Sequence, residues 1–199
     1  MAVIDDFEDG DITNDPTWTV GAGTVQIQST NPHAGTYGME LVNVSVEPNC
    51  YTAITATRIR AWVKNTSIAD AYMYLRETGD AYGAFMGFRL DTFKCTNGGI
   101  GAYTTFATTP VADTWYLFDI ENISTTLTTF RLYNAALTLL ETQANQTNWN
   151  AGTPDQLWFA CANVTGNTFY IDDVSSYEAP AERTYKAMVA VEADGTLII

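Results

Sequence analysis

The feature that most constrains this 199-residue sequence is a succession of short, alternating segments separated by turn signals at intervals of roughly 8–12 residues. Thr, Val, Ile, Tyr, Phe and Trp dominate these segments, and these residue types are enriched in β-strands. Apolar residues at helical spacing are hard to find in any window. The pattern therefore predicts an all-β fold, either a sandwich or a barrel.

Turn-forming residues set the boundaries of the predicted strands. Residues 31–35 contain Pro and Gly and lead into an alternating strand that ends at Leu41, and Thr96-Asn97-Gly98-Gly99 predicts a hairpin turn. Residues 143–154 are predicted to form a polar loop. The other strands are predicted at residues 3–8, 18–20, 24–28, 51–64, 71–77, 83–91, 100–106, 115–121, 127–134, 137–142, 156–163 and 168–177. Together they make one domain over residues 1–178.

The first and last of these strands share an unusual pattern, in which adjacent aspartates stand among apolar residues. They are residues 3–8, with Asp5-Asp6, and residues 169–176, with Asp172-Asp173. We predict that the last strand returns to lie beside the first. Asp is depleted in strands, so its presence here needs a cause. One cause is a cation held between the chain ends, because Ca²⁺ prefers carboxylate and carbonyl oxygens. The other interpretation is that these are solvated acids at strand ends.

The charge and composition of the chain exclude several classes of protein. A net charge of −14 argues against nucleic-acid binding, which needs clustered Lys and Arg. No apolar run approaches the roughly 20 residues of a membrane span, and the N-terminus lacks the pattern of a signal peptide. Cys50, Cys95 and Cys161 have no zinc-type spacing, so we expect free, buried thiols.

Alternation along three strands predicts a surface rich in cations and aromatic rings. If Ile59, Met73, Met86 and their alternating neighbours face the core, five of the nine cations share one sheet surface with several aromatic side chains. The predicted members are Arg58, Arg60, Trp62, Tyr72, Tyr74, Arg76, Phe85 and Arg89, and Lys64 is the fifth cation on the same face. Three interpretations remain open: a subunit interface, a glycan groove with sugars stacked on the rings, or a solvated face paired with acids.

Three further segments stand in order along the chain: Asp6-Phe7-Glu8-Asp9-Gly10, residues 32–41, and Tyr170-Ile171-Asp172-Asp173-Val174. Together they resemble the jelly-roll sandwiches of carbohydrate-binding modules and laminin-G-like domains. The resemblance implies a jelly-roll β-sandwich of two antiparallel sheets with a structural Ca²⁺. It also implies Glu8 and Asp172 as side-chain ligands, a carbonyl oxygen from His33 or Gly35, and Asp6 as an additional ligand.

The last residues predict a separate element, a C-terminal β-hairpin or arm. Residues 179–182 indicate a short linker, and residues 183–199 form a hairpin pattern around Asp194-Gly195. An isolated two-stranded hairpin is marginal in water, so this one must pack on the sandwich or on another subunit. We favour another subunit, which predicts a homo-oligomer.

The acidic Phe7-Glu8-Asp9-Gly10 opening, soon after the initiator Met, also resembles predicted structural proteins of tailed viruses that infect haloarchaea. This resemblance implies a virion structural protein, such as a capsid decoration, turret or tail component, made in the host cytoplasm and bound to other virion proteins. The alternative is an extracellular carbohydrate-binding module or a receptor-binding domain for a cell-surface glycan. We expect no enzyme, because His33 is the one histidine and Asp119-Ile120-Glu121 is an incomplete acid motif.

Overall fold

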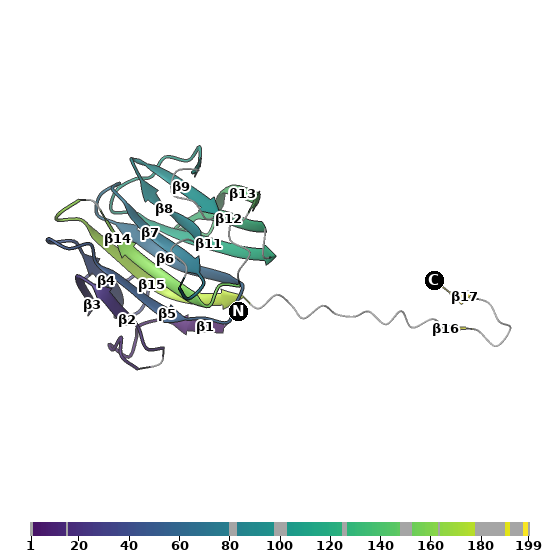
Figure 1. Ribbon diagram of the computed structural model, residues 1–199, viewed down its shortest axis with the longest axis horizontal. Coiled ribbons are helices and arrows are strands. Elements are labelled where there is room, and N and C mark those ends of the chain that lie inside the picture. The colour runs from purple at the N-terminus through teal and green to yellow at the C-terminus, as the bar shows by residue number, and fades with distance from the viewer. Residues whose placement is uncertain are drawn as a thin grey trace.

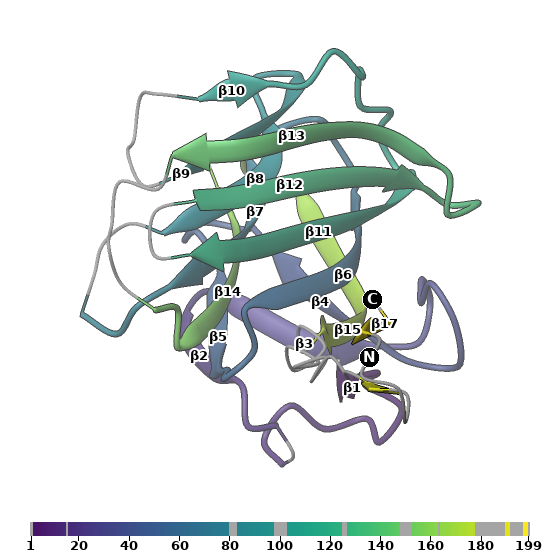
Figure 2. The same ribbon diagram turned by 90° about the vertical axis from the view of Figure 1, so that its right-hand side faces the viewer.

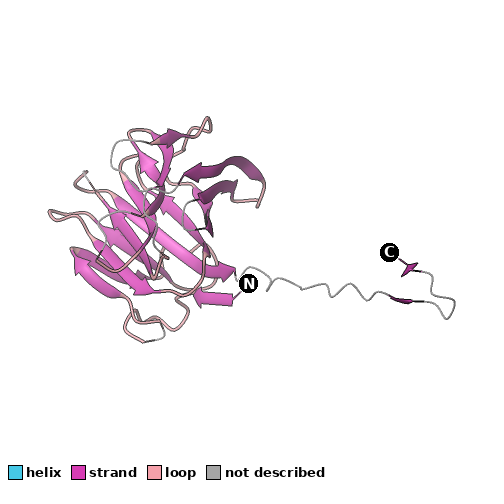
Figure 3. Cartoon of the chain, turned by 45° about the vertical axis from the view of Figure 1, so that its right-hand side comes forward, coloured by secondary structure: helices cyan, strands magenta, loops and turns pink. Residues whose placement is uncertain are grey.

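In the computed structural model, two antiparallel β-sheets pack face to face (Figure 1). The structure describes residues 2–14, 16–79, 83–97, 103–124, 127–147, 153–162, 164–177, 190–191 and 197–198. The described ranges contain strands, turns and loops without a helix (Figure 3), so no helix there is long and apolar enough to cross a membrane. The predicted all-β sandwich of two antiparallel sheets is confirmed.

The eight-stranded sheet is organised around the last long strand of the sandwich, β15 (Thr168–Tyr177). In spatial order the sheet runs β13 (Leu139–Thr147), β12 (Leu127–Asn134), β11 (Trp115–Ser124), β6 (Arg58–Asn65), β15, β4 (Gly38–Val42) and β3 (Thr24–Gln28), with β1 (Ala2–Asp5) also beside β15. Figure 2 looks onto the part of this sheet that β13, β12, β11 and β6 form. Strands β11, β12 and β13 pair with their neighbours in sequence, as β3 pairs with β4, whereas β15 pairs with β6, β4 and β1 from distant parts of the chain. The sheet therefore combines local hairpins with long-range pairing.

The seven-stranded sheet forms the other layer of the sandwich. Its spatial order is β10 (Thr104–Thr105), β9 (Thr92–Asn97), β8 (Ala84–Arg89), β7 (Ala71–Arg76), β14 (Gln156–Cys161), β5 (Asn49–Ala53) and β2 (Thr19–Ala22). Strand β14 enters from late in the chain and separates β7 from β5, with antiparallel pairing on both sides. Strands β5, β14 and β7, which are distant in the sequence, are therefore adjacent in the sheet. Their outward side chains together form the outer face of this layer.

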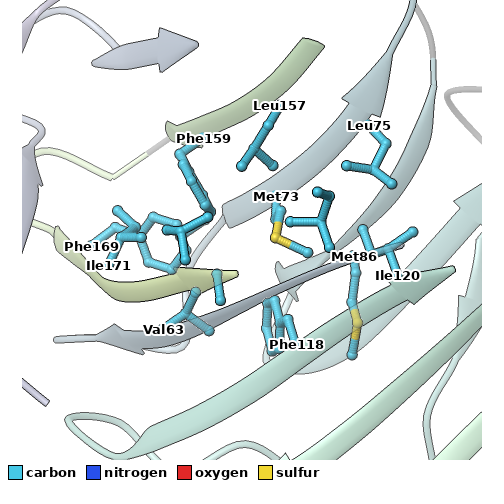
Figure 4. Close-up of a cluster of buried hydrophobic side chains, with 14 of the residues drawn as sticks. Val63, Met73, Leu75, Met86, Phe118, Ile120, Leu157, Phe159, Phe169 and Ile171 are labelled. Atoms are coloured by element: carbon cyan, nitrogen blue, oxygen red, sulfur yellow. The ribbon is translucent and has the colours of Figure 1, made fainter. Parts of the chain in front are cut away.

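The core lies between the sheets and is made by alternate residues of their strands. Val63 and Phe118 point inward from the eight-stranded sheet, and Met73 and Phe159 point inward from the seven-stranded sheet (Figure 4). All four are fully buried, which confirms the predicted alternation. Burying a large apolar side chain contributes roughly 1.5–3 kcal/mol, so this layer is the main source of stability. The three cysteines are free and buried, also as predicted.

The two ends of the sandwich meet as the sequence predicts. Strand β1 pairs antiparallel with the second half of β15, with Ala2 opposite Ser176. The register of β15 against β6 shifts between Asp172 and Ser175, and Asp173 has a positive φ of 46°. Asp tolerates this left-handed conformation better than most residues. The adjacent aspartates therefore mark a β-bulge.

The predicted strand over residues 51–64 is wrong as a single element. Its first part belongs to β5 in the seven-stranded sheet and its second part to β6 in the eight-stranded sheet. The chain crosses between the sheets at residues 54–57. Apolar side chains occupy even positions at Ile54 and Ala56 but odd positions from Ile59 onward. A single alternating strand cannot make that change, because its side chains keep a period of two.

Two other predicted boundaries are also wrong. Residues 92–97 form β9, which pairs with β8 through a turn at Leu90 and Asp91, before the predicted turn at 96–99. Both turn residues have positive φ, 48° and 62°, which is uncommon for Leu and explains why the sequence gives no turn signal there. Strand β13 continues to Thr147, into the predicted polar loop. Residues 98–102 and 148–152 lie outside the described residues.

The C-terminal residues contribute one more described pairing. Strand β16 (Ala190–Val191) pairs antiparallel with β17 (Leu197–Ile198), as expected for the predicted hairpin. The linker at 179–182 and the turn at Asp194-Gly195 lie outside the described residues. The role of this hairpin in assembly stays a prediction.

Candidate functional site

Two carboxylates from opposite ends of the chain hold the loop at residues 33–37, which leads into β4. Glu8 Oε1 accepts the backbone N–H groups of residues 36 and 37 at 2.8 and 3.0 Å. Asp172 Oδ2 accepts those of residues 33 and 34 at 2.7 and 3.1 Å. Hydrogen bonds to an ionised acceptor are stronger than neutral ones. These contacts fasten the loop to the segment that follows β1, through Glu8, and to the last strand, through Asp172.

The structure brings the predicted metal ligands together but gives them different contacts. The backbone N–H of His33, and not its carbonyl oxygen, faces Asp172 Oδ2. Asp6 Oδ1 accepts the backbone N–H of Glu8 at 3.2 Å. Gly35, with φ of 64°, passes so close to Glu8 that a Cβ would collide with the carboxylate. Within the described ranges, no group of three His, Cys, Asp or Glu side chains could hold a metal ion. Since these carboxylates face N–H donors, the residues as placed do not form a calcium cage, and the ion stays a prediction from the resemblance.

The stability of the protein is expected to rise as the pH falls from about 7 to about 5. Burial raises the pKa of Asp5 and of Asp172 from 3.8 to about 6, although hydrogen bonds, such as that from Trp18 Nε1 to Asp5 at 2.7 Å, act in the opposite direction. Between pH 4 and 6 the folded state therefore binds more protons than the unfolded state, which stabilises it as the pH falls. We expect the free energy of unfolding, measured with urea at high salt, to increase by an amount on the order of 2 kcal/mol.

The Asp5→Asn variant is the control for this pH effect. Its amide oxygen still accepts a hydrogen bond but does not titrate, so part of the gain should disappear. At more acidic pH the trend reverses, because backbone N–H groups of Tyr37 and Thr36 lower the pKa of Glu8 and its contribution is lost on protonation. A free energy of unfolding that is unchanged between pH 7 and pH 5 would contradict the prediction.

The predicted surface of cations and rings is wrong as a single surface. Strand β6 belongs to the eight-stranded sheet, whereas β7 and β8 belong to the seven-stranded sheet. Their outward side chains face opposite sides of the sandwich, because each strand turns its other face to the common core. Arg58, Arg60 and Trp62 lie on one face, and Tyr72, Tyr74, Arg76, Phe85 and Arg89 lie on the other.

On the seven-stranded sheet, four aromatic side chains stand in register across adjacent strands. Tyr51 on β5 is opposite Trp158 on β14, Trp158 is opposite Tyr74 on β7, and Tyr74 is opposite Phe85 on β8. We call these four residues the aromatic row. The Tyr51 and Trp158 rings stack at 4.4 Å and 13°, and the Tyr74 and Phe85 rings meet edge-on at 5.2 Å. Such pairs contribute beyond the area they bury, so the row is a preorganised surface.

Further side chains widen the aromatic row. Tyr72 lies 5.1 Å from the rings of both Tyr74 and Phe85, and Tyr103 lies 5.5 Å from Phe85. Tyr72 has room because the outward position opposite it is Gly87, where a Cβ would lie 2.5 Å from the Tyr72 Cβ. Burial raises the pKa of Tyr74 to about 12, so its phenol stays neutral and keeps its proton as a hydrogen-bond donor.

The aromatic row also carries cations. The Arg76 guanidinium lies 4.3 Å from the Trp158 ring centroid, and the Arg89 guanidinium lies 4.8 Å from the Tyr103 ring. A cation over an aromatic face is attracted by the ring quadrupole. Rings and cations therefore occupy one outer surface, which suits ligands that combine apolar faces with polar or anionic groups.

The opposite face is organised around one buried acid, Asp119 on β11, which is 0% exposed. Arg58 binds its carboxylate through two hydrogen bonds of 2.9 and 2.6 Å, and Arg60 Nε donates a third at 2.9 Å. Arg131 lies 3.9 Å away and pairs with Glu121 at 2.6 Å. The bond to Asp119 raises the pKa of Arg58 above its ordinary value. This cluster is a structural ion-pair network whose acid is fully satisfied.

A cavity of about 350 Å³ lies beside this network. Its walls come from strands β1, β6, β11 and β15 and from the turn between β12 and β13, and they are Val3, Arg60, Trp62, Leu117, Leu137, Asp173, Val174 and Ser175. Several of its groups already have protein partners. His33 stacks on Trp62 at 3.9 Å and its Nδ1 lies 3.1 Å from Asp173, while Arg60 is bonded to Asp119.

Sequence reasoning missed three members of the aromatic surface: Tyr51, Trp158 and Tyr103. Alternation with buried neighbours already indicates that Trp158 points outward, since Leu157 and Phe159 are core residues. The missing information was which strands are neighbours. Only the insertion of β14 between β5 and β7 brings Trp158 beside Tyr51 and Tyr74.

No family model matches the chain, and no curated protein matches its sequence. Solved structures do share its fold. A carbohydrate esterase from the Shiga toxin-encoding bacteriophage phi24B matches with a TM-score of 0.57 and 11% identity, over 86% of this chain and 94% of that one. The fold is a β-sandwich found in a phage protein that acts on carbohydrate.

Botulinum neurotoxins supply further similar structures. The serotype D binding domain matches with a TM-score of 0.53 and 13% identity, over 82% of this chain and 44% of that one. A type C toxin, whose entry into cells depends on two ganglioside molecules, matches with a TM-score of 0.57 and 11% identity, over 90% and 48%. The chain thus spans less than half of these toxin chains. At such identities the comparisons establish the shared β-sandwich fold alone, and the resemblance to haloarchaeal viral proteins stays a prediction.

Proposed function

We propose that this chain is a non-catalytic carbohydrate-binding domain that takes a glycan over its aromatic row. The observation that carries the proposal is the register of Tyr51, Trp158, Tyr74 and Phe85 across four adjacent strands of one outer face. The apolar faces of sugar rings pack against aromatic side chains, and Tyr hydroxyls and Arg guanidinium groups bind sugar hydroxyls. The sandwich supplies a rigid base for this surface. Similar folds in a phage carbohydrate esterase and in ganglioside-dependent toxins support the same function.

The aromatic row is the better candidate of the two faces. In the cavity on the eight-stranded sheet, Trp62 is only 8% exposed and stacks on His33, and the Arg60 and Asp173 side chains contact protein groups. On the row, Tyr51, Trp158 and Tyr74 are half-buried, so each of these three rings keeps some accessible surface. Phe85 is only 1% exposed and packs beneath the row against Tyr72 and Tyr74. A sugar therefore meets more available aromatic surface on the seven-stranded sheet.

Replacing Trp158 by alanine is expected to weaken glycan binding by roughly 30-fold, the equivalent of about 2 kcal/mol. The change removes the ring that links Tyr51 to Tyr74 in the row and leaves the inward side chains of β14 in place. A glycan array on the full-length protein identifies a ligand, and titration calorimetry then compares the affinities of the wild type and the variant.

Two variants control for this experiment. Trp115→Ala removes a half-buried tryptophan from the outward face of the other sheet and should leave the affinity unchanged. Trp158→Phe keeps an aromatic ring and should retain most of the binding. An array without any bound glycan, or equal affinities of the wild type and Trp158→Ala, would overturn the proposal.

The virion role predicted from the sequence is compatible with glycan binding, since a particle component can also attach to a cell-surface glycan. Its support is the acidic opening and the apolar C-terminal hairpin pattern, together with a fold shared with a phage protein. The test is the solution mass in molar salt before and after deletion of residues 183–199. A closed oligomer that depends on these residues is the expected result for a virion component, and a monomer would contradict it.

A further inference from the structure

The cavity on the eight-stranded sheet is a largely apolar hollow with an exposed rim. Trp62, Leu117 and Val174 form its buried part and are 8%, 4% and 0% exposed, whereas Val3 and Leu137 at the rim are 66% and 62% exposed. Single exposed apolar side chains need no explanation, but two beside one apolar hollow form a patch that a partner can cover. A volume of about 350 Å³ gives room for several aliphatic side chains.

The two charged groups of this cavity already have protein partners. Arg60 Nε donates to Asp119 at 2.9 Å, and Asp173 Oδ2 lies 3.1 Å from His33 Nδ1. A polar ligand would have to compete with these contacts. An apolar occupant would leave them in place and would be stabilised by the apolar surface that it removes from water.

One segment of this chain matches the cavity in its chemistry. Residues 188–191 are Met-Val-Ala-Val, and residues 197–199 are Leu-Ile-Ile. Strands β16 and β17 within them pair with each other and with no other described strand (Figure 1). A two-stranded hairpin is marginal in water without a surface on which to pack. An apolar hairpin and an apolar cavity therefore offer each other the partner that neither has among the described residues.

The chain also leaves the sandwich beside this cavity. Ser175, which lines the cavity, is opposite Arg60, and Tyr177 at the end of β15 is opposite Arg58. At about 3.4 Å per residue, the strand ends roughly 7 Å beyond the cavity wall. Residues 178–189 join β15 to β16 and can span up to roughly 40 Å, which is several times that distance. Such a tether holds the hairpin near its own cavity at an effective concentration on the order of millimolar.

We propose that the hairpin of β16 and β17 docks in this cavity of its own molecule and covers Val3 and Leu137. Docking buries apolar surface while Arg60 and Asp173 keep their partners, so neither charge loses its compensation. The sequence left two surfaces open for the hairpin, the sandwich and another subunit, and the short tether favours the sandwich. The cavity and the aromatic row lie on different sheets, so hairpin docking and glycan binding are independent of each other.

Amide hydrogen exchange on the full-length protein tests this contact. In the wild type, the amides of β16 and β17 should exchange at least about tenfold more slowly than in an unfolded peptide of the same sequence. Leu137→Asn removes a rim side chain, and Asn suits the positive φ of 58° at this position, so the sandwich should stay folded. This variant should lower the protection of the hairpin about tenfold, as expected when one leucine side chain is no longer buried.

Two further variants make the result specific to the cavity. Val3→Thr keeps the β-branched shape at the other rim position but makes it polar, and it should also lower the protection. Leu90→Asn is the control, because Leu90 is likewise a leucine with a positive φ, 48°, and is 70% exposed. It lies in the turn between β8 and β9 of the seven-stranded sheet, so its replacement should leave the protection of the hairpin unchanged.

Sedimentation and hydrogen exchange at two protein concentrations identify the molecule that supplies the hairpin. A monomer with the same hairpin protection at both concentrations is the expected result. An oligomer that depends on residues 183–199, or protection that fades on dilution, would assign the hairpin to a second copy, as expected for the virion role, and would overturn docking in the same molecule. Unprotected β16 and β17 amides in the wild type, or equal protection in the wild type, Leu137→Asn and Val3→Thr, would overturn the cavity as the docking site.

Discussion

Replacing Asp119 by alanine is expected to lower the free energy of unfolding by about 3–5 kcal/mol. The carboxylate is fully buried and accepts three hydrogen bonds from Arg58 and Arg60, with Arg131 at 3.9 Å. Removing it leaves positive charges close together over the sheet without the acid that compensates them. Urea unfolding at neutral pH and moderate salt measures the effect.

Two control variants separate the loss of the buried Asp119 charge from the loss of volume and of a surface ion pair. Asp119→Asn keeps the volume and one acceptor but loses the charge, so an intermediate loss is expected. Glu121→Ala removes the half-exposed partner of Arg131 and should cost less than about 1 kcal/mol, as for a surface ion pair. A loss below 1 kcal/mol for Asp119→Ala would show that the network contributes little.

Replacing Asp172 by alanine is expected to lower the free energy of unfolding by about 2–4 kcal/mol. Asp172 is 1% exposed and accepts the N–H groups of His33, Ala34 and Asp173. Without it, three partly buried backbone donors lose their acceptor and the 33–37 loop loses one of its two carboxylate anchors. Amide hydrogen exchange should accelerate at residues 33 and 34, while the protection of core strands changes only with global stability.

The same variant also tests the predicted calcium ion. Thermal unfolding of the wild type is followed with added Ca²⁺ and with a chelator. A midpoint that falls on chelation in the wild type, and does not respond in Asp172→Ala, would support an ion held at the chain ends. A thermal midpoint of the wild type that is the same with and without Ca²⁺ would contradict the predicted calcium site. The hydrogen bonds that Asp172 accepts would then be the connection between the loop and the last strand.

Much of the local structure could be predicted because side-chain alternation is written directly in the sequence. The inward positions of Val63, Met73 and Met86 follow from a period of two. The pairing of the first and last strands was also predictable from their shared Asp-Asp pattern. The change of apolar parity between Ala56 and Ile59 was present as well, and it marks the point where the chain leaves one sheet for the other.

The turn before β9 could not be predicted in the same way. Leu90 and Asp91 adopt left-handed φ values of 48° and 62°, whereas such turns usually contain Gly or Asn. Pairing of β8 with β9 on one side and β7 on the other stabilises this strained turn. Because the cause lies in tertiary contacts, local sequence preferences do not reveal it.

The sequence by itself determined the β class, the strand faces, the buried thiols and the meeting of the chain ends, because each depends on local residue patterns. The tertiary structure alone decided which strands are neighbours. That choice sends Arg58, Arg60 and Trp62 to one face and Tyr72, Tyr74 and Phe85 to the other, and it places Trp158 between Tyr51 and Tyr74. Strand order depends on long-range hydrogen bonding and on packing of two sheets over one core, and alternation within a single strand contains no information about its partner.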